Sequence, residues 1–302
     1  MQISKTEPIA STFLEITPDT WEQAKELGIL LTNCVFRGHE DNRWQLTTTL
    51  ERAATQFNCP PENLWLQEKQ IINQFRSRAH HYISSPPKDN EYIEWLSLIQ
   101  HYGGPTRLLD FTRSFYIASF FAVETAKHDA CVWGINFLLP LFDAINNKYL
   151  VYDKSNILEP QSISARLAET FLANEAKELD FVLRVEPTRL NERLAIQQGT
   201  FLFPFTITKS FEQNLCATFS FPFDSLASKN STEVEFKTLQ QDIVLAKESL
   251  KVIKINLPRK WHKSIMIDLN SMNINSVSLF PGLDGFARSL RLIVRKMEQP
   301  FL

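Results

Sequence analysis

Residues 99 to 112, IQHYGGPTRLLDFT, bring several chemically useful side chains into one short segment. His101 provides an imidazole, Arg107 a guanidinium, Asp110 a carboxylate and Thr112 a hydroxyl, and apolar residues flank them. This mixture is too polar for a core strand, and its setting is too apolar for an ordinary surface loop. We therefore interpret the segment as part of a functional site.

A purely structural explanation of the same segment is also open. His101 would be a cation in the last turn of a helix that Gly103 ends, and Asp110 would cap a helix that begins near Ser114. Arg107 and Asp110 are three positions apart and would point to opposite faces of an ideal strand, so an ion pair between them is not required.

An arginine with a similar chemical capacity occurs earlier, in VFRGHE. The guanidinium of Arg37 offers two parallel donors to a phosphate or a carboxylate. Gly38 follows it, and a missing side chain lets a ligand approach the backbone closely. From this segment alone, an ordinary surface arginine at a strand end and an arginine that binds a phosphate or a carboxylate both remain open.

Two later segments place polar groups at helix ends. In RLAIQQGTFLF, Gln197 and Gln198 end a helix before Gly199, where an amide could hydrogen-bond a sugar hydroxyl or simply face solvent. In SLFPGLDGFARSL, Asp284 lies just ahead of a helix and is most economically its N-terminal cap.

Caps and hydrophobic spacing predict the elements that position these groups. The N-terminal half is helix-rich, and later strands and helices alternate irregularly. The expected early elements are a helix from Asp19 to Gly28, a strand at 30–38, a helix opened by the capping pair Thr48 and Glu51, and helices within 60–83 and 91–104.

This pattern favours an α+β fold with a mixed or antiparallel central sheet over a doubly wound fold. No glycine-rich phosphate loop occurs, so side chains would have to hold any nucleotide. The length of 302 residues, 44% of them apolar, allows either two average domains or one extended core, and we expect one domain over 1–302 with a core at about 30–298. We expect a helical insertion at about 47–102 and an exposed excursion at about 225–240.

Composition narrows the possible partners. A net charge of −2 gives no overall basic field for nucleic acid or membrane surfaces. The four cysteines are dispersed without a C-x-x-C pair, which predicts reduced, mostly buried thiols and no metal. No apolar run reaches about 18 residues, and the first 20 residues lack the apolar core of a signal peptide, so we expect a cytoplasmic protein without a membrane partner.

Taken together, the segments resemble the FRG domain, a family of bacterial and phage proteins. The resemblance spans about residues 36 to 290 and rests on the motifs FRG, QHYGGPTRLLDFT, QQGTF and LFPGLDG, with Trp44 and Leu46 after the first of them. The order of motifs is similar to that of arginine-type ADP-ribosyltransferases, with Arg37 matching the first motif and DFTRS the second. Such enzymes carry a glutamate in the third, where this chain has QQG.

The resemblance implies an ADP-ribosyltransferase-like cleft that takes NAD as substrate without a metal. Arg37 would bind the pyrophosphate or the adenosine-side ribose, Asp110 or Asp284 would stabilise positive charge on the other ribose, and His101 would accept a proton. The expected catalytic residues are His101, Asp110, Gln198 and Asp284, and the expected NAD-binding residues are Arg37, Gly38, Arg107, Thr112 and Gln197.

Three functions remain open at this point. The first is an ADP-ribosyltransferase or NAD glycohydrolase that acts as a toxin or defence effector on a protein or nucleic acid, with an antitoxin as a candidate partner. The second is an RNA-binding or RNA-cleaving protein with His101, Arg107 and Arg37 around a phosphate, and the third is a non-catalytic sensor or partner-binding module. We expect Arg37, Arg107 and Asp110 to converge on one cleft.

Overall fold

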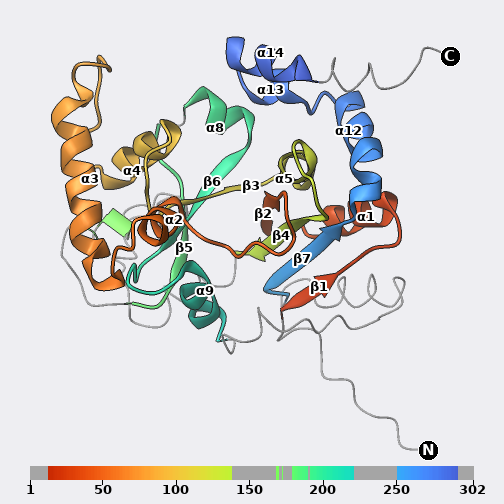
Figure 1. The fold of residues 1–302 in the computed structure, drawn as a ribbon, viewed down its shortest axis with the longest axis horizontal. Helices are drawn as coiled ribbons and strands as arrows, with labels where there is room; N and C mark the ends of the chain where they lie inside the picture. The colour runs from red at the N-terminus through yellow and green to blue at the C-terminus, as the bar shows by residue number, and fades with distance from the viewer. Residues whose placement is uncertain are drawn as a thin grey trace, which may run out of the picture.

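A computed structural model describes residues 13–137, 168–169, 172, 179–189, 191–220 and 250–291. In these residues seven strands form one sheet in the order β1-β7-β4-β2-β3-β6-β5 (Figure 1). The β1–β7 pair is parallel and the other five pairs are antiparallel, so the predicted α+β class with a mixed sheet is confirmed. The strands are β1 Leu14–Ile16, β2 Cys34–His39, β3 Leu109–Thr112, β4 Ala130–Asn136, β5 Val182–Val185, β6 Gly199–Pro204 and β7 Val252–Leu257.

Helices cover both faces of this sheet. The segment between β2 and β3 is helical, as the N-terminal half was predicted to be. The predicted excursion at 225–240 lies outside the described residues. The described helices are α1 Trp21–Leu30, α2 Thr49–Gln56, η2 Pro61–Asn63, α3 Leu64–Ala79, α4 Tyr92–His101, α5 Phe115–Val123, α8 Glu192–Ile196, α9 Phe211–Phe219, η3 Arg259–Trp261, α12 His262–Ser271, α13 Ser276–Leu279 and α14 Leu283–Ser289.

Three apolar clusters bury the sheet. On one face, α1, α5 and α12 pack against β2, β4 and β7, while α3 and α4 pack against β5 and β6 (Figure 1). On the opposite face, α9 packs against β2, β3, β4 and β6. Alternation along the strands produces this division, because Val35 and Phe36 of β2 belong to clusters on opposite faces.

Local sequence rules account for most helix boundaries. Thr48 and Glu51 form the predicted reciprocal capping box, and Gly103, with φ +81°, follows the end of α4. The first helix departs from prediction, because the Thr20 hydroxyl caps it in place of Asp19 and it continues to Leu30. The strand predicted from residue 30 therefore starts only at Cys34.

All four cysteines are free thiols, as predicted. Cys34, Cys131 and Cys216 are buried, and Cys59 is half-buried. Burial raises the pKa of both Cys34 and Cys131 to about 12, so these thiols stay protonated and unreactive at neutral pH.

Candidate functional site

The sheet separates between its central strands β2 and β3, and a cavity forms there. β2 pairs with β4 along six residues but with β3 only at Phe36–Thr112. The cavity has a volume of about 1000 Å³, within the range of small-molecule sites. Its lining comes from β2, the loop before α2, α4, β3, α5, α8 and β6. The fold therefore places the predicted strand-end residues Arg37 and Asp110 in a single cavity.

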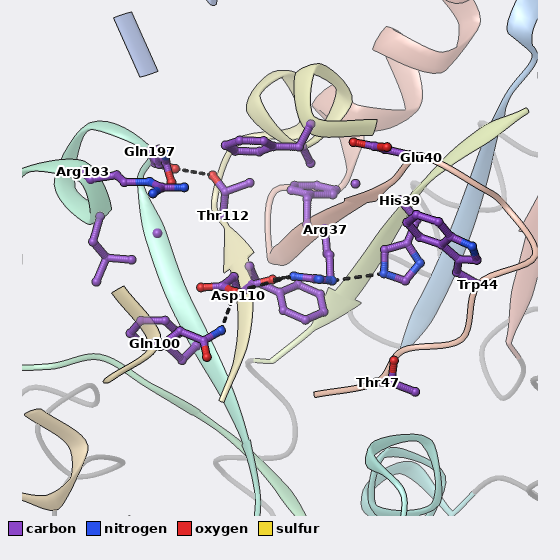
Figure 2. Close-up of a pocket in the computed structure, with 18 of the residues that line it drawn as sticks. Arg37, His39, Glu40, Trp44, Thr47, Gln100, Asp110, Thr112, Arg193 and Gln197 are labelled. Carbon is purple, nitrogen blue, oxygen red and sulfur yellow. Dashed lines mark hydrogen bonds and ion pairs between the residues drawn. The ribbon is translucent and has the colours of Figure 1, made fainter. Parts of the chain in front are cut away.

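Arg37 lies where the two strands separate. Its Nη1 donates to the backbone oxygen of Asp110 at 2.7 Å, and its Nε donates to His39 Nε2 at 3.1 Å (Figure 2). A guanidinium has five N–H groups, so these two bonds leave three for other acceptors. The side chain is 19% exposed and lines the cavity. Arg37 both bridges the split sheet and offers donors to a ligand.

Gly38 has a different role from the expected one. A Cβ atom at this position would lie 2.0 Å from the Ala118 oxygen and 2.6 Å from the Ala122 nitrogen. The missing side chain therefore admits the backbone of α5, and not a ligand as we expected from the sequence. The glycine sets the close packing of β2 against α5, which forms one wall of the cavity.

Gly38→Ala should destabilise the protein by about 3 kcal/mol or more, because backbone atoms of α5 cannot move aside as a side chain would. Chemical denaturation of both proteins measures this difference. Gly103→Ala is the matched control, since no atom lies within 4 Å of its added Cβ and only the positive φ opposes the change. It should cost about 1 kcal/mol. A Gly38→Ala protein as stable as the control would contradict the packing role.

His39 is a site residue that the sequence analysis missed. It lines the cavity, is only 6% exposed, and accepts the Arg37 Nε–H through Nε2. Its proton is therefore on Nδ1. Burial lowers the pKa of His39 to about 3, and the nearby charge of Arg37 adds to this effect. His39 is thus a neutral acceptor that orients Arg37 at working pH.

This burial predicts a pH dependence of folding. The unfolded chain binds a proton on His39 below pH 6.5, whereas the folded protein does so only near pH 3. Stability is therefore highest above pH 6.5 and is lost as the pH falls toward 3. Relative to His39→Gln, which keeps an acceptor for Arg37 but does not titrate, the wild type should lose about 2 to 3 kcal/mol between pH 7.5 and pH 4.5.

Urea unfolding of both proteins at the two pH values tests this prediction. Comparing them cancels the contribution of every other titrating group that the two proteins share. A stability difference that stays constant between pH 7.5 and pH 4.5 would contradict the buried, neutral state of His39.

Asp110 is the exposed carboxylate of the cavity. Its side chain is 56% exposed, accepts from Gln100 Nε2 at 2.8 Å, and lies 4.0 Å from Arg37 Nη1 (Figure 2). The structural explanation proposed for it is wrong, because the hydroxyl of Ser114 caps α5. The Asp110 carboxylate therefore lies in the cavity, is oriented by Gln100 and remains accessible to a ligand.

The other end of the cavity is lined by α4 and α8. His101, from the last turn of α4, and Arg193, from α8, both line it. Burial lowers the pKa of His101, and the charge of Arg193 lowers it further. His101 therefore favours its neutral form, as a proton acceptor requires.

The residues of the second and third motifs are only partly in the cavity. Thr112 and Gln197 line it, but the Thr112 hydroxyl donates to the Gln197 backbone oxygen at 2.7 Å. The Gln197 amide donates to the Leu279 oxygen at 2.9 Å. Gln198 is exposed, has φ 49°, and is not among the lining residues. The geometry therefore does not support the catalytic role expected for Gln198.

Arg107 does not join the cavity, so the predicted convergence of Arg37, Arg107 and Asp110 is wrong for this residue. Arg107 is 1% exposed and forms a buried ion pair with Glu68 of α3. Its Nη1 also donates to the Phe205 oxygen at 3.0 Å, and its guanidinium lies 5.0 Å from the Phe203 ring. All its strong contacts join α3 to the β6 region, which is a structural role.

Asp284 also lies apart from the lining residues. It is exposed in the first turn of α14, where Gly282 occupies the N-cap position without a side-chain bond. The expected capping role is therefore wrong, and its expected place at the reacting ribose has no geometric support. Its negative charge does favour the charged form of Arg193.

Three further lining residues carry useful chemistry that we did not assign from the sequence. Glu40 provides a second carboxylate, which accepts from the Thr125 hydroxyl. Trp44 is 53% exposed and offers an aromatic face, and Arg52 adds a positive charge. The sequence did give one indication of Glu40 and Trp44 as site residues. Both follow Arg37 within a few positions, and a loop that leaves the end of a strand stays near that end.

In the described part of the chain, no group of three or more His, Cys, Asp or Glu side chains is placed to hold a metal ion. None of the helices in this part is both long and apolar enough to cross a membrane.

Fold and site together define an α+β protein whose mixed sheet opens at its centre into an arginine-lined cavity. Residues 32–131 match the family model of the FRG domain. The matched segment includes Arg37, His39, His101 and Asp110, whereas Arg193 lies beyond it. No curated protein and no solved structure gives a significant match to the chain.

Proposed function

We propose that the cavity between β2 and β3 binds NAD and that the protein is an ADP-ribosyltransferase-like enzyme. It would act as a toxin or defence effector on a macromolecular target, and an antitoxin would inhibit it. The observation that carries this proposal is the pairing of an open carboxylate, Asp110, with the guanidinium of Arg37, 4.0 Å away, in a cavity of about 1000 Å³.

The arrangement of the lining suits a dinucleotide. Arg37 lies between His39 and Trp44 on one side and Asp110 on the other (Figure 2). NAD has a central pyrophosphate with a nucleoside on either side. The free N–H groups of Arg37 match the pyrophosphate, and the exposed ring of Trp44 offers a stacking face for a base.

The reaction needs a negative charge beside the nicotinamide ribose. The bond from the nicotinamide nitrogen to ribose C1′ breaks, nicotinamide leaves with the electron pair, and positive charge develops on the ribose. The carboxylate of Asp110, held by Gln100, stabilises that charge. The acceptor then forms its bond to C1′ and gives its proton to the neutral imidazole of His101.

The third motif is where this chain differs from arginine-type transferases. The Gln197 amide is engaged with Leu279, and Gln198 is outside the lining, so neither takes the place of the missing glutamate. Glu40 and Asp110 line the cavity and each accepts a hydrogen bond, from Thr125 and from Gln100 respectively, but Asp110 is exposed whereas Glu40 is half-buried. We therefore assign the charge-stabilising role to Asp110.

The alternatives have less support. The RNA-cleaving hypothesis needed Arg107 near the phosphate, and Arg107 is buried against Glu68. A non-catalytic sensor would use the same cavity and bind NAD without consuming it, so it differs from the enzyme in turnover alone.

The test is to incubate the purified protein with labelled NAD and a cell extract. Free nicotinamide and the label in the protein and nucleic-acid fractions are then measured, with Asp110→Asn as the control. We expect nicotinamide release and label in one macromolecular fraction, both lost in the variant. NAD binding with no release of nicotinamide would favour the sensor, and absence of both would refute the proposal.

A further inference from the structure

Arg193 is a cation in the cavity without an anionic partner. It lines the end formed by α4 and α8, and Figure 2 shows its guanidinium on the cavity side of α8. Among the described residues its guanidinium has no hydrogen bond or ion pair, and it lies 4.7 Å from the ring of Phe280. The guanidinium of Arg288 also lies over the Phe280 ring, 3.9 Å from its centroid. Two arginines thus share one aromatic ring, and only Arg288 has a carboxylate partner, Glu124.

Such a position is electrostatically unfavourable in the free protein. Arg193 is half-buried, and burial together with the charge of Arg288 lowers its pKa, while Asp110 and Asp284 oppose this effect. An incompletely paired cation in a partly desolvated site gains energy when an anion arrives. Arg193 lines the cavity, so a ligand inside it has access to this guanidinium.

A second group that suits an anion lies at the same end. His101 lines the cavity, and Arg193 is close enough for its charge to affect the imidazole. On its other side, Asp110 separates this end from Arg37, and it interacts favourably with both arginines. The cavity thus has two cationic centres with the proposed reacting carboxylate between them.

We propose that Arg193 and His101 form a second anion subsite that binds a phosphate group, distinct from the subsite at Arg37. A phosphate suits this pair because it carries up to two charges and several acceptor oxygens, which a forked guanidinium and an imidazole can share. The further assignment of that phosphate rests on the proposed function. If the NAD pyrophosphate occupies Arg37 and its ribose faces Asp110, Arg193 lies beyond that ribose, in the part of the cavity that remains for the acceptor. The phosphate is then one carried by the acceptor.

Two histidines report the two subsites separately. His39 accepts a hydrogen bond from Arg37, and His101 lies beside Arg193. The experiment is a titration of histidine-labelled protein with inorganic phosphate, followed by the NMR signals of both imidazole rings. We expect both rings to respond, with independent saturation curves.

Single substitutions then separate the curves. Arg193→Gln should weaken the His101 response at least tenfold and leave that of His39 unchanged, while Arg193→Lys should give an intermediate loss. Arg189→Gln is the matched control, because Arg189 is an exposed arginine outside the cavity and should change neither response. A silent His101, or responses of both rings that are lost together in Arg193→Gln, would overturn the second subsite.

Two further binding comparisons identify the molecule that carries the phosphate. NADP and NAD are compared for affinity, and 5′-phosphorylated and unphosphorylated oligonucleotides are compared on protein saturated with ADP-ribose. We expect at least tenfold preference for the phosphorylated oligonucleotide, dependent on Arg193, and no preference for NADP. Preference for NADP, or equal binding of an acidic peptide, would overturn the acceptor assignment but not the subsite. The phosphate titration needs no NAD turnover, so failure of the proposed function is seen separately.

Discussion

Arg37→Lys should weaken NAD binding about 100-fold, close to 3 kcal/mol of binding free energy at 25 °C. Lysine keeps the positive charge but has no planar fork. It cannot donate to the Asp110 oxygen and to His39 while also presenting two parallel N–H groups to a pyrophosphate. Isothermal titration calorimetry with NAD measures the loss, and Arg189→Lys, outside the cavity, should bind like the wild type.

The same substitution also tests the contribution of Arg37 to the stability of the fold. Because Arg37 joins β2 to β3 through the Asp110 oxygen, we expect about 1 to 3 kcal/mol of lost stability as well. Weak binding must therefore be measured on protein shown to be folded. Undiminished NAD affinity in folded Arg37→Lys would remove Arg37 from the binding site.

Asp110→Asn should reduce NAD turnover about 100- to 1000-fold while changing NAD affinity only slightly. Asparagine keeps the size of the side chain and an oxygen that accepts from Gln100, but it removes the charge that stabilises the ribose cation. Since Ser114 and not Asp110 caps α5, the fold should tolerate the change. The rate of nicotinamide release under saturating NAD measures the effect.

Growth of a bacterial host gives an independent measure of the same change. Producing the wild-type protein without a partner should arrest growth, because even about 1 to 10 turnovers per second consume or modify a target quickly. Asp110→Asn should relieve the arrest at equal protein level. Arrest that persists in the variant, or turnover equal to the wild type, would contradict the role of this carboxylate.

Local patterns predicted the parts of this protein that depend on neighbours in the sequence. The capping box of Thr48 and Glu51 and the stop at Gly103 follow from backbone chemistry within a few residues, and the structure has both. Arg37 and Asp110 were also predicted to meet, from the tendency of sites to collect residues at strand ends, and they lie 4.0 Å apart.

Contacts between distant segments were not predictable in this way. Arg107 pairs with Glu68, 39 positions away, and nothing near Arg107 in the sequence indicates which side of β6 it packs against. The space around Gly38 is filled by α5, which is distant in the sequence. The sequence near Gly38 therefore cannot distinguish a glycine that allows close packing from one that makes room for a ligand. His39 was missed for a related reason, since its burial depends on the covering loop and not on its neighbours.

A crystal structure of Asp110→Asn with NAD tests the central claim most directly, because this variant should bind NAD and leave it intact. We predict a dinucleotide between β2 and β3, its pyrophosphate within hydrogen-bond distance of Arg37 and its nicotinamide ribose beside residue 110. The cavity in the described residues has the required volume of about 1000 Å³. A dinucleotide bound elsewhere, or a cavity that stays empty at saturating NAD, would contradict this account.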